Sequence, residues 1–160
     1  VYEDIREARA FQEFDLVWLE EPTIPETFKG HRRILSEGGV PISAGENLHT
    51  LFDFQHMLEA NGVSYIEPDV SNCGGITVWM KVAKLAEARN LPVTSHGVHD
   101  IHVHLLGAIP NASYLEIHGF GLERFIIEPL QIKDGHATAN EKSGHGISFD
   151  WKALEEYRIS

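Results

Sequence analysis

The chain has 160 residues, of which 42% are hydrophobic and 23% are charged, a composition typical of a globular domain. Its 24 acidic side chains outnumber 13 Lys and Arg residues, giving a net charge of -11. This balance argues against nucleic acid as a partner, and it fits either a solvated surface or carboxylates that bind a hard cation. The single cysteine, Cys73, excludes an internal disulfide and favours a reducing, cytoplasmic compartment. No run reaches the roughly 18 apolar residues of a membrane span.

Short β-prone runs alternate along the chain with segments of helical spacing. A charged helical pattern covers residues 1–10. Buried strands are predicted at residues 16–19, 40–43, 64–66, 91–94 and 113–115. Helices are predicted between them at residues 28–36, 51–60, 76–89 and 101–109. This alternation is typical of repeated βα units around a parallel sheet, which is either open or closed into a barrel.

The sequence from Leu130 onward has a different character, with several glycines around strand-like pieces at residues 131–133 and 147–149. A final helix is expected at residues 151–157, and Asp150 has the position and side chain of its N-cap. We therefore expect residues 130–160 to form a short return segment that packs on the βα part, residues 1–129.

An ionisable side chain stands at the carboxyl end of each predicted strand. These residues are Glu20, Glu46, Asp69, His96 and Glu116. In a (β/α)8 barrel the carboxyl ends of the strands surround one site, so this distribution favours a barrel over an open sheet. Acidic residues are common in the loops that follow strands, and position alone does not assign them a role.

Each of these residues belongs to a short sequence motif. The motifs are Leu-Glu-Glu-Pro at 19–22, Gly-Glu-Asn at 45–47, Pro-Asp at 68–69, Ser-His-Gly at 95–97 and Tyr-Leu-Glu at 114–116. They resemble, in order, the motifs after strands four to eight in the mandelate racemase group of the enolase superfamily. The five ionisable residues are 26, 23, 27 and 20 residues apart, which suits successive βα units. The resemblance implies an α/β fold that is part of a TIM-type (β/α)7β barrel, with strands four to eight and a C-terminal return segment. The N-terminal capping domain and the first barrel strands are expected to be absent.

The resemblance also implies Mg²⁺ as the cofactor, with Glu20 and Glu46 as two of its three ligands. Carboxylate oxygens suit a hard cation with octahedral coordination. The third ligand of the family, an Asp on the third strand, would lie upstream of Val1, as would a second-strand motif that contains the opposing acid or base. Glu21 points to the other side of its strand and is expected to be a structural partner.

Asp69 and His96 resemble the catalytic pair that this group carries on strands six and seven. A carboxylate beside an imidazole fixes its tautomer and favours its protonated form, and enolase-superfamily sites use a Lys or His base together with Mg²⁺. Glu116 resembles the strand-eight Glu that hydrogen-bonds the substrate carboxylate. Asn47 and Ser95 flank these residues and are candidate substrate contacts.

The implied reaction is removal of the proton next to the carboxylate of a small-molecule substrate. Dehydration of a sugar acid is expected, and racemisation or epimerisation of a 2-hydroxy acid is an alternative on the same site. The full-length protein is expected to be a homo-oligomer without a membrane partner. A catalytically inactive fragment is a further alternative, because the third ligand and the capping domain would be missing.

Three histidines suggest a competing enzyme class. His99, His102 and His104 contain a His-x-His pair, a motif that also occurs in zinc amidohydrolases on the same barrel. The apolar spacing of residues 101–109 nevertheless predicts a helix here, whereas the amidohydrolase pair belongs on a first strand. Residues 72–75, Asn-Cys-Gly-Gly, resemble a phosphate loop, but we interpret them as a tight turn into a helix.

Overall fold

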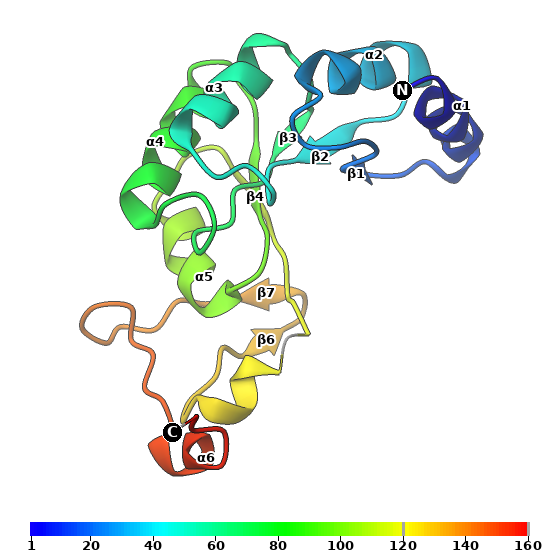
Figure 1. Ribbon diagram of the computed structural model, residues 1–160. Helices are drawn as coiled ribbons and strands as arrows, with labels where there is room; N and C mark the ends of the chain where they lie inside the picture. The colour runs from blue at the N-terminus through cyan, green and yellow to red at the C-terminus, as the bar shows by residue number, and fades with distance from the viewer. Residues whose placement is uncertain (120, 160) are drawn as a thin grey trace.

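The computed structural model describes residues 1–119 and 121–159. Its centre is a parallel sheet in the order β1-β2-β3-β4-β5 (Figure 1). The strands are β1 (Leu19–Glu20), β2 (Ile42–Ala44), β3 (Tyr65–Ile66), β4 (Val93–Ser95) and β5 (Ala112–Leu115). The helices that connect them are α2 (Phe28–Gly38), α3 (Leu51–Glu59), α4 (Ile76–Glu87) and α5 (His99–Gly107). Helix α1 (Tyr2–Phe11) packs against α2.

Consecutive strands are neighbours in the sheet, and each pair is joined by one helix, which is the arrangement of successive βα units of a TIM-type barrel. The predicted fold class is therefore confirmed. Within the described residues, the two edge strands β1 and β5 each pair on one side only.

The core lies between the sheet and its helices. Ile42, Ala44, Ile66 and Val93 face the helices and are fully buried. The opposite face of the sheet has three aromatic rings, from Trp18, Tyr65 and Tyr114. The Trp18 ring centroid lies 5.0 Å from that of Tyr65 and 5.4 Å from that of Tyr114. Trp18 directly precedes β1, Tyr65 lies on β3 and Tyr114 lies on β5. Side chains from alternate strands form one layer of a barrel interior in this way.

Four of the five strands begin one to three residues later than the sequence predicts, two of them directly after a proline, and β5 begins one residue earlier. Pro41 and Pro92 have no backbone N–H group and cannot extend the hydrogen-bond ladder upstream. Their carbonyl oxygens still accept hydrogen bonds, from Leu19 N at 2.8 Å and from Ile66 N at 3.1 Å. The first predicted strand, residues 16–19, consequently contributes only its last residue to β1.

The five predicted helices of the βα part are confirmed to within two residues at each end. Helix α3 shows why its start was readable from the sequence. The Thr50 hydroxyl accepts a hydrogen bond from Asp53 N, and the Asp53 carboxylate accepts one from Thr50 N, so the two residues form a capping box. Among the described residues, no helix has both the length and the apolar character needed to cross a bilayer.

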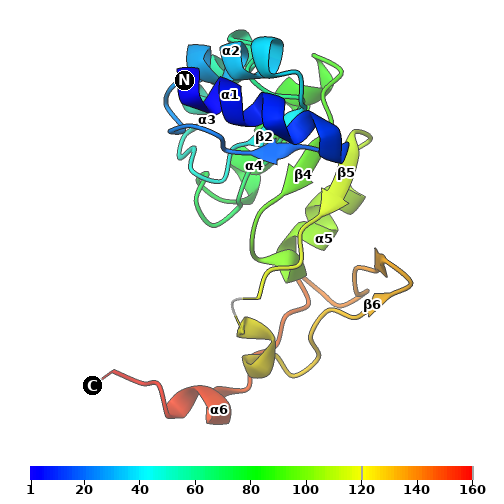
Figure 2. The same cartoon turned by 90° about the vertical axis from the view of Figure 1, so that its right-hand side faces the viewer.

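The segment after residue 120 contains η2 (Leu122–Phe125), the antiparallel hairpin β6 (Ile132–Lys133) and β7 (His136–Ala137), and α6 (Trp151–Glu155). It extends away from α2, α3 and α4 (Figures 1 and 2). Ile126 is its one buried side chain among residues 121–159, and Leu130 N donates to Asp100 Oδ1 of α5 at 3.0 Å.

Some local predictions in this segment are confirmed and others are wrong. Asp150 is the N-cap of α6, because its Oδ1 accepts from Lys152 N at 3.0 Å and from Ala153 N at 3.1 Å. The strand predicted at residues 147–149 is only an isolated bridge between Phe149 and Ile126. The strand predicted at residues 131–133 is β6, which forms a hairpin with β7, and the turn at residues 134–135 is an Asp-Gly pair with positive φ at both positions.

Candidate active site at the carboxyl ends of the strands

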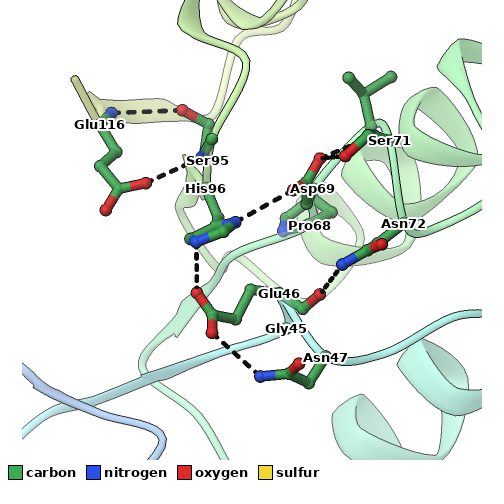
Figure 3. Close-up of polar contacts among 12 residues, drawn as sticks. Gly45, Glu46, Asn47, Pro68, Asp69, Ser71, Asn72, Ser95, His96 and Glu116 are labelled. Atoms are coloured by element: carbon green, nitrogen blue, oxygen red, sulfur yellow. Dashed lines mark hydrogen bonds and ion pairs between the residues drawn. The ribbon is translucent and has the colours of Figure 1, made fainter. Parts of the chain in front are cut away.

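The predicted site residues all lie at or just beyond the carboxyl ends of their strands. Glu20 ends β1, His96 directly follows β4, and Glu116 directly follows β5. Glu46 and Asp69 lie in the loops after β2 and β3. Glu46 and Asp69 contact the His96 ring directly, and Glu116 accepts a hydrogen bond from the backbone N of the next residue, Gly97. Figure 3 shows these side chains around the His96 ring. Glu20 lies on the neighbouring strand, where its carboxylate accepts a hydrogen bond from Trp18 Nε1 at 3.2 Å.

His96 lies between two carboxylates. Its Nδ1 is 3.0 Å from Asp69 Oδ2, and its Nε2 is 2.7 Å from Glu46 Oε2 (Figure 3). Burial alone would lower the pKa of His96, but the hydrogen bond that its ring donates to Asp69 and the charges of Glu46 and Glu116 raise this pKa above its ordinary value. Both carboxylates thus stabilise the protonated imidazole, whose two N–H groups can each be directed at one of them.

Asp69 is held on its other side by Ser71. Asp69 Oδ1 accepts hydrogen bonds from Ser71 N at 2.7 Å and from Ser71 Oγ at 2.6 Å. Burial would raise the pKa of Asp69, but the two bonds from Ser71 and the bond from His96 lower it below its usual value. Asp69 thus remains ionised and fixed in orientation. Sequence reasoning missed Ser71, although Asp-x-Ser is a local pattern that permits this turn.

The Glu116 carboxylate is oriented by the backbone of the neighbouring loop. Its Oε2 accepts a hydrogen bond from Gly97 N at 2.8 Å, and Glu116 N donates to Ser95 Oγ at 3.3 Å (Figure 3). Ser95 is fully buried. Its hydroxyl therefore acts on the Glu116 backbone rather than on the open side of the site.

A second hydrogen-bond network lies after β1 and β2. Asn47 Nδ2 donates to Glu46 Oε1 at 3.0 Å and to Glu21 Oε2 at 2.7 Å. Glu21 Oε1 accepts from Gly45 N at 3.2 Å, which is the structural function expected for Glu21. Gly45 itself is required by close packing, because a Cβ there would lie 2.8 Å from the carbonyl oxygen of Glu67. Asn47 thus orients carboxylates.

The carboxylates of this region fit a hard divalent cation. Burial raises the pKa of Glu46, and the negative charges of Glu21 and Glu20 raise it further, although His96 acts in the opposite direction. A bound cation would relieve this repulsion between like charges. The oxygen-only donors Glu20 and Glu46 match the ligands that Mg²⁺ prefers.

Glu67 is a buried acid that the sequence analysis did not single out. It is 1% exposed, and its Oε2 accepts a hydrogen bond from Ser43 Oγ at 2.8 Å. Burial raises its pKa to about 8, the Ser43 bond opposes this shift, and the charges of Glu20, Glu116 and Glu46 add to it. Glu67 is therefore largely protonated at neutral pH. The signal was its spacing of two residues from Tyr65, which places both side chains on the same face of the strand.

The three histidines that suggested a zinc amidohydrolase, His99, His102 and His104, lie on helix α5 rather than on a strand. His102 is fully buried, and both of its ring nitrogens have backbone partners: Nε2 accepts from Val70 N at 3.0 Å, and Nδ1 lies 3.1 Å from the oxygen of Gly97. The zinc amidohydrolase alternative is therefore wrong for this His-x-His pair. His102 instead ties the loop that carries Asp69 to the loop that carries His96.

The Asn-Cys-Gly-Gly run forms the expected tight turn into a helix. Cys73 N donates to Asp69 O at 2.8 Å and Gly75 N donates to Val70 O at 3.1 Å, directly before α4. Gly74 and Gly75 both have positive φ, at 103° and 87°. Cys73 is buried, which raises the pKa of its thiol to about 11 and leaves it unreactive.

Residues 1–153 match the family model of enolase C-terminal domain-like proteins. A 3,6-anhydro-alpha-L-galactonate cycloisomerase from Streptomyces coelicolor is 51% identical over 150 residues, which are 94% of this chain and 42% of that protein.

Two solved structures share the fold. A racemase from Streptomyces coelicolor A3(2), with bound magnesium, has a TM-score of 0.91 and 48% identity over 96% of this chain and 42% of its own. An L-talarate dehydratase from Polaromonas sp. JS666, complexed with Mg and L-glucarate, has a TM-score of 0.89 and 31% identity over the same shares, 96% and 42%. The chain thus spans about two fifths of the length of these proteins.

Proposed function

The chain belongs to the enolase C-terminal domain-like family, and from this premise we propose that it carries part of the active site of a lyase that acts on sugar acids. The proposed reaction removes the proton from the carbon next to the substrate carboxylate, and an oxygen substituent then leaves the following carbon. The observation that carries the proposal is the 3.0 Å hydrogen bond between Asp69 and His96 at the strand ends, flanked by Glu46 and Glu116.

His96 Nε2 is the proposed site of proton transfer. Asp69 holds Nδ1, so the other ring nitrogen faces Glu46 and the open side of the rim. As a neutral base, His96 takes the α-proton, and in its protonated form it returns a proton to the departing oxygen. The electron pair of the broken C–H bond forms a double bond to the β-carbon, whose C–O bond breaks. The resulting enol becomes a 2-oxo acid.

The remaining residues bind and orient the substrate in this proposal. Glu116, held by Gly97 N, is placed to hydrogen-bond a substrate oxygen. Glu20 and Glu46 would hold Mg²⁺, which when bound stabilises the negative charge that develops on the substrate carboxylate. Asn47 and Ser95 were candidate substrate contacts, and their hydrogen bonds support a positioning function through Glu46 and Glu116.

Two leaving groups fit the same chemistry. In an ordinary sugar acid the β-oxygen is a hydroxyl, which leaves as water, and one structural relative is an L-talarate dehydratase. In a 3,6-anhydro sugar acid the β-oxygen belongs to a ring ether, so its departure opens the ring without loss of atoms. Dehydration is our first assignment, and the 51% identity to a cycloisomerase favours ring opening as the second. Racemisation, the third possibility, would return the proton to the other face of the α-carbon.

We further propose that strands outside residues 1–160 supply the third Mg²⁺ ligand and the opposing acid or base. Two observations support this: the chain spans about two fifths of its relatives, and β1 and β5 pair on one side only among the described residues. Residues 1–160 alone should then bind Mg²⁺ far more weakly than a protein with the complete barrel, and should show no turnover. Calorimetric titration of both proteins with Mg²⁺ is the measurement, and equal affinities would contradict the assignment.

Product analysis tests the proposed reaction. The complete protein, with Mg²⁺, is incubated with L-glucarate, with D-xylonate and with a 3,6-anhydro sugar acid, and 2-oxo acid formation is followed. We expect Mg²⁺-dependent formation of a 2-oxo acid from at least one of them. The matched control is His136→Ala, which removes an exposed imidazole from β7 and should retain the rate. An absence of 2-oxo acid from all three, or formation of an α-epimer alone, would contradict the lyase assignment.

A further inference from the structure

A group of mixed nitrogen and oxygen ligands lies on the β4–β5 side of the rim. Within the part of the chain that the structure describes, His96, Glu116 and His118 are the group of three whose potential ligand atoms all lie within 4.8 Å of one another. All three side chains are partly exposed, so an ion from solvent can reach them. The His96 and His118 rings are 5.2 Å apart between centroids, at an angle of 74°.

Neighbouring groups already orient these ligands. His96 Nδ1 is bonded to Asp69, which leaves Nε2, 2.7 Å from Glu46 Oε2, as the ligand atom, and carboxylate–imidazole pairs of this kind commonly support metal ligands. Glu116 Oε2 is fixed by a hydrogen bond from Gly97 N at 2.8 Å. The loop that carries His118 is anchored through its backbone N, 3.4 Å from His99 Nδ1.

The ligand types distinguish this group from the carboxylates at the other end of the rim. Imidazole nitrogen combined with one carboxylate suits Zn²⁺ and similar transition-metal ions, whereas Mg²⁺ prefers oxygen ligands and retains several waters. His118 contributes nothing to the reaction proposed above. Its position beside His96 instead adds a second imidazole to the group, within 4.8 Å of the other two ligand atoms.

We propose that His96, Glu116 and His118 form a binding site for one transition-metal dication such as Zn²⁺, and that Glu20 and Glu46 are not among its ligands. Water is the expected fourth ligand, because structural zinc sites are closed by protein but three-ligand sites keep one open position. Binding replaces the proton between His96 Nε2 and Glu46 Oε2 and occupies the nitrogen that the proposed reaction uses. Transition-metal ions therefore inhibit the Mg²⁺ enzyme. The inhibition rests on the proposed function, but the binding does not.

Calorimetric titration of the chain with Zn²⁺ in excess Mg²⁺ tests the site. We expect one Zn²⁺ per chain, and an affinity at least about tenfold weaker in His118→Ala, since even loss of a residue that only supports a ligand costs about 10–100-fold. His136→Ala should bind as the wild type does. Equal affinity in the wild type and His118→Ala, or no binding, would overturn the proposal. As a second measurement that also reports ligand type, Co²⁺ should give visible absorption of a nitrogen-coordinated ion in the wild type and lose it in His118→Ala.

The inhibition has its own test in the complete protein. Zn²⁺ should slow 2-oxo acid formation in the wild type at fixed Mg²⁺, and His118→Ala should need at least about tenfold more Zn²⁺ for the same effect. Inhibition of equal strength in both proteins would overturn the link between this site and His96. If the wild type forms no 2-oxo acid at all, the proposed function fails, while the titration still decides whether the metal site exists.

Discussion

The two sides of the rim differ in chemistry although the same parallel sheet builds both. The carboxylate side, after β1 and β2, presents Glu20, Glu46 and the supporting Glu21. The imidazole side, after β4 and β5, presents His96, His118 and one carboxylate, Glu116. The backbone geometry is alike on both sides, so the residue types decide what each side can do. Oxygen ligands suit a hard cation, and imidazoles suit proton transfer and softer metal ions.

The hydrogen bond between Glu46 Oε2 and His96 Nε2 joins the two sides. A residue assigned to the metal and a residue assigned to the proton therefore share one contact. A substitution on one side should therefore reveal how independent the two sides are. Substitutions at Glu46, Glu67, His102 and Asp69 each leave the ligands of at least one side in place.

Glu46→Gln should remove Mg²⁺ binding from the carboxylate side. Loss of a charged ligand is expected to weaken Mg²⁺ by at least about 100-fold in the complete protein, equivalent to about 2.7 kcal/mol. The affinity for Zn²⁺ should not fall, because the imidazole side keeps its three ligands. Calorimetry measures both ions, and Glu26→Gln, at an exposed carboxylate, is the control. If Glu46→Gln weakens both ions equally, the two sides form one site.

Glu67→Gln should change how stability depends on pH. Burial raises the pKa of Glu67 to about 8, so between pH 4.5 and pH 8 the folded chain keeps a proton that the unfolded chain releases. The free energy of unfolding of the wild type should therefore fall as pH rises through this window, by up to roughly 1.4 kcal/mol per pH unit. Glu67→Gln lacks this proton.

The measurement is urea unfolding of the metal-free protein at pH 5 and pH 7. Relative to the wild type, Glu67→Gln should gain about 2 kcal/mol between these values, within the limit set by that slope. Ser43 Oγ can still donate to the side-chain carbonyl of the variant, so the fold should survive. A difference between the two proteins that stays constant with pH would show that Glu67 is ionised in the folded state.

His102→Phe should destabilise the imidazole side without removing a ligand. The substitution leaves Val70 N and the Gly97 oxygen without their buried partner, at a cost of roughly 1–3 kcal/mol. Urea unfolding measures the change, and His136→Phe at an exposed position is the control. A loss under about 0.5 kcal/mol would mean that His102 is not needed to hold the two loops together.

Asp69→Asn should lower the pKa of His96. Burial acts to lower this pKa, and Asp69 is the largest of the groups that raise it, so removing its charge should bring the pKa down. NMR titration of the His96 ring in the metal-free protein gives the value directly. Asp15→Asn, at an exposed position, should leave it unchanged. An unchanged or higher pKa in Asp69→Asn would show that Glu46 and Glu116 set the charge of His96.

Local signals made much of the fold predictable. The helices follow from apolar spacing and from caps such as Thr50, because both depend on residues a few positions apart. The strand limits were less accurate, since the ladder at Leu19 depends on Pro41, which directly precedes another strand, β2. The Asp134-Gly135 turn shows a different failure, because its local hairpin signal was present but was not used.

The site was predictable only where chemistry coincides with a strand end. Glu46, Asp69 and His96 could be placed at the rim from their positions and motifs alone. The support around them depends on distant pairs, such as Val70 with His102, which are 32 residues apart. The raised pKa of Glu67 and the placement of His118 beside His96 likewise depend on three-dimensional neighbours.

Exchange of the α-proton of a sugar-acid substrate with solvent deuterium tests most directly whether the Asp69–His96 pair moves this proton. Proton NMR of the substrate and product in D₂O, with the complete protein and saturating Mg²⁺, follows the loss of the α-proton. We expect this loss to be slower in His96→Ala by about 10²–10⁴-fold, the usual contribution of a general acid or base, with Mg²⁺ affinity retained. Loss of the α-proton at the wild-type rate in His96→Ala would contradict the account.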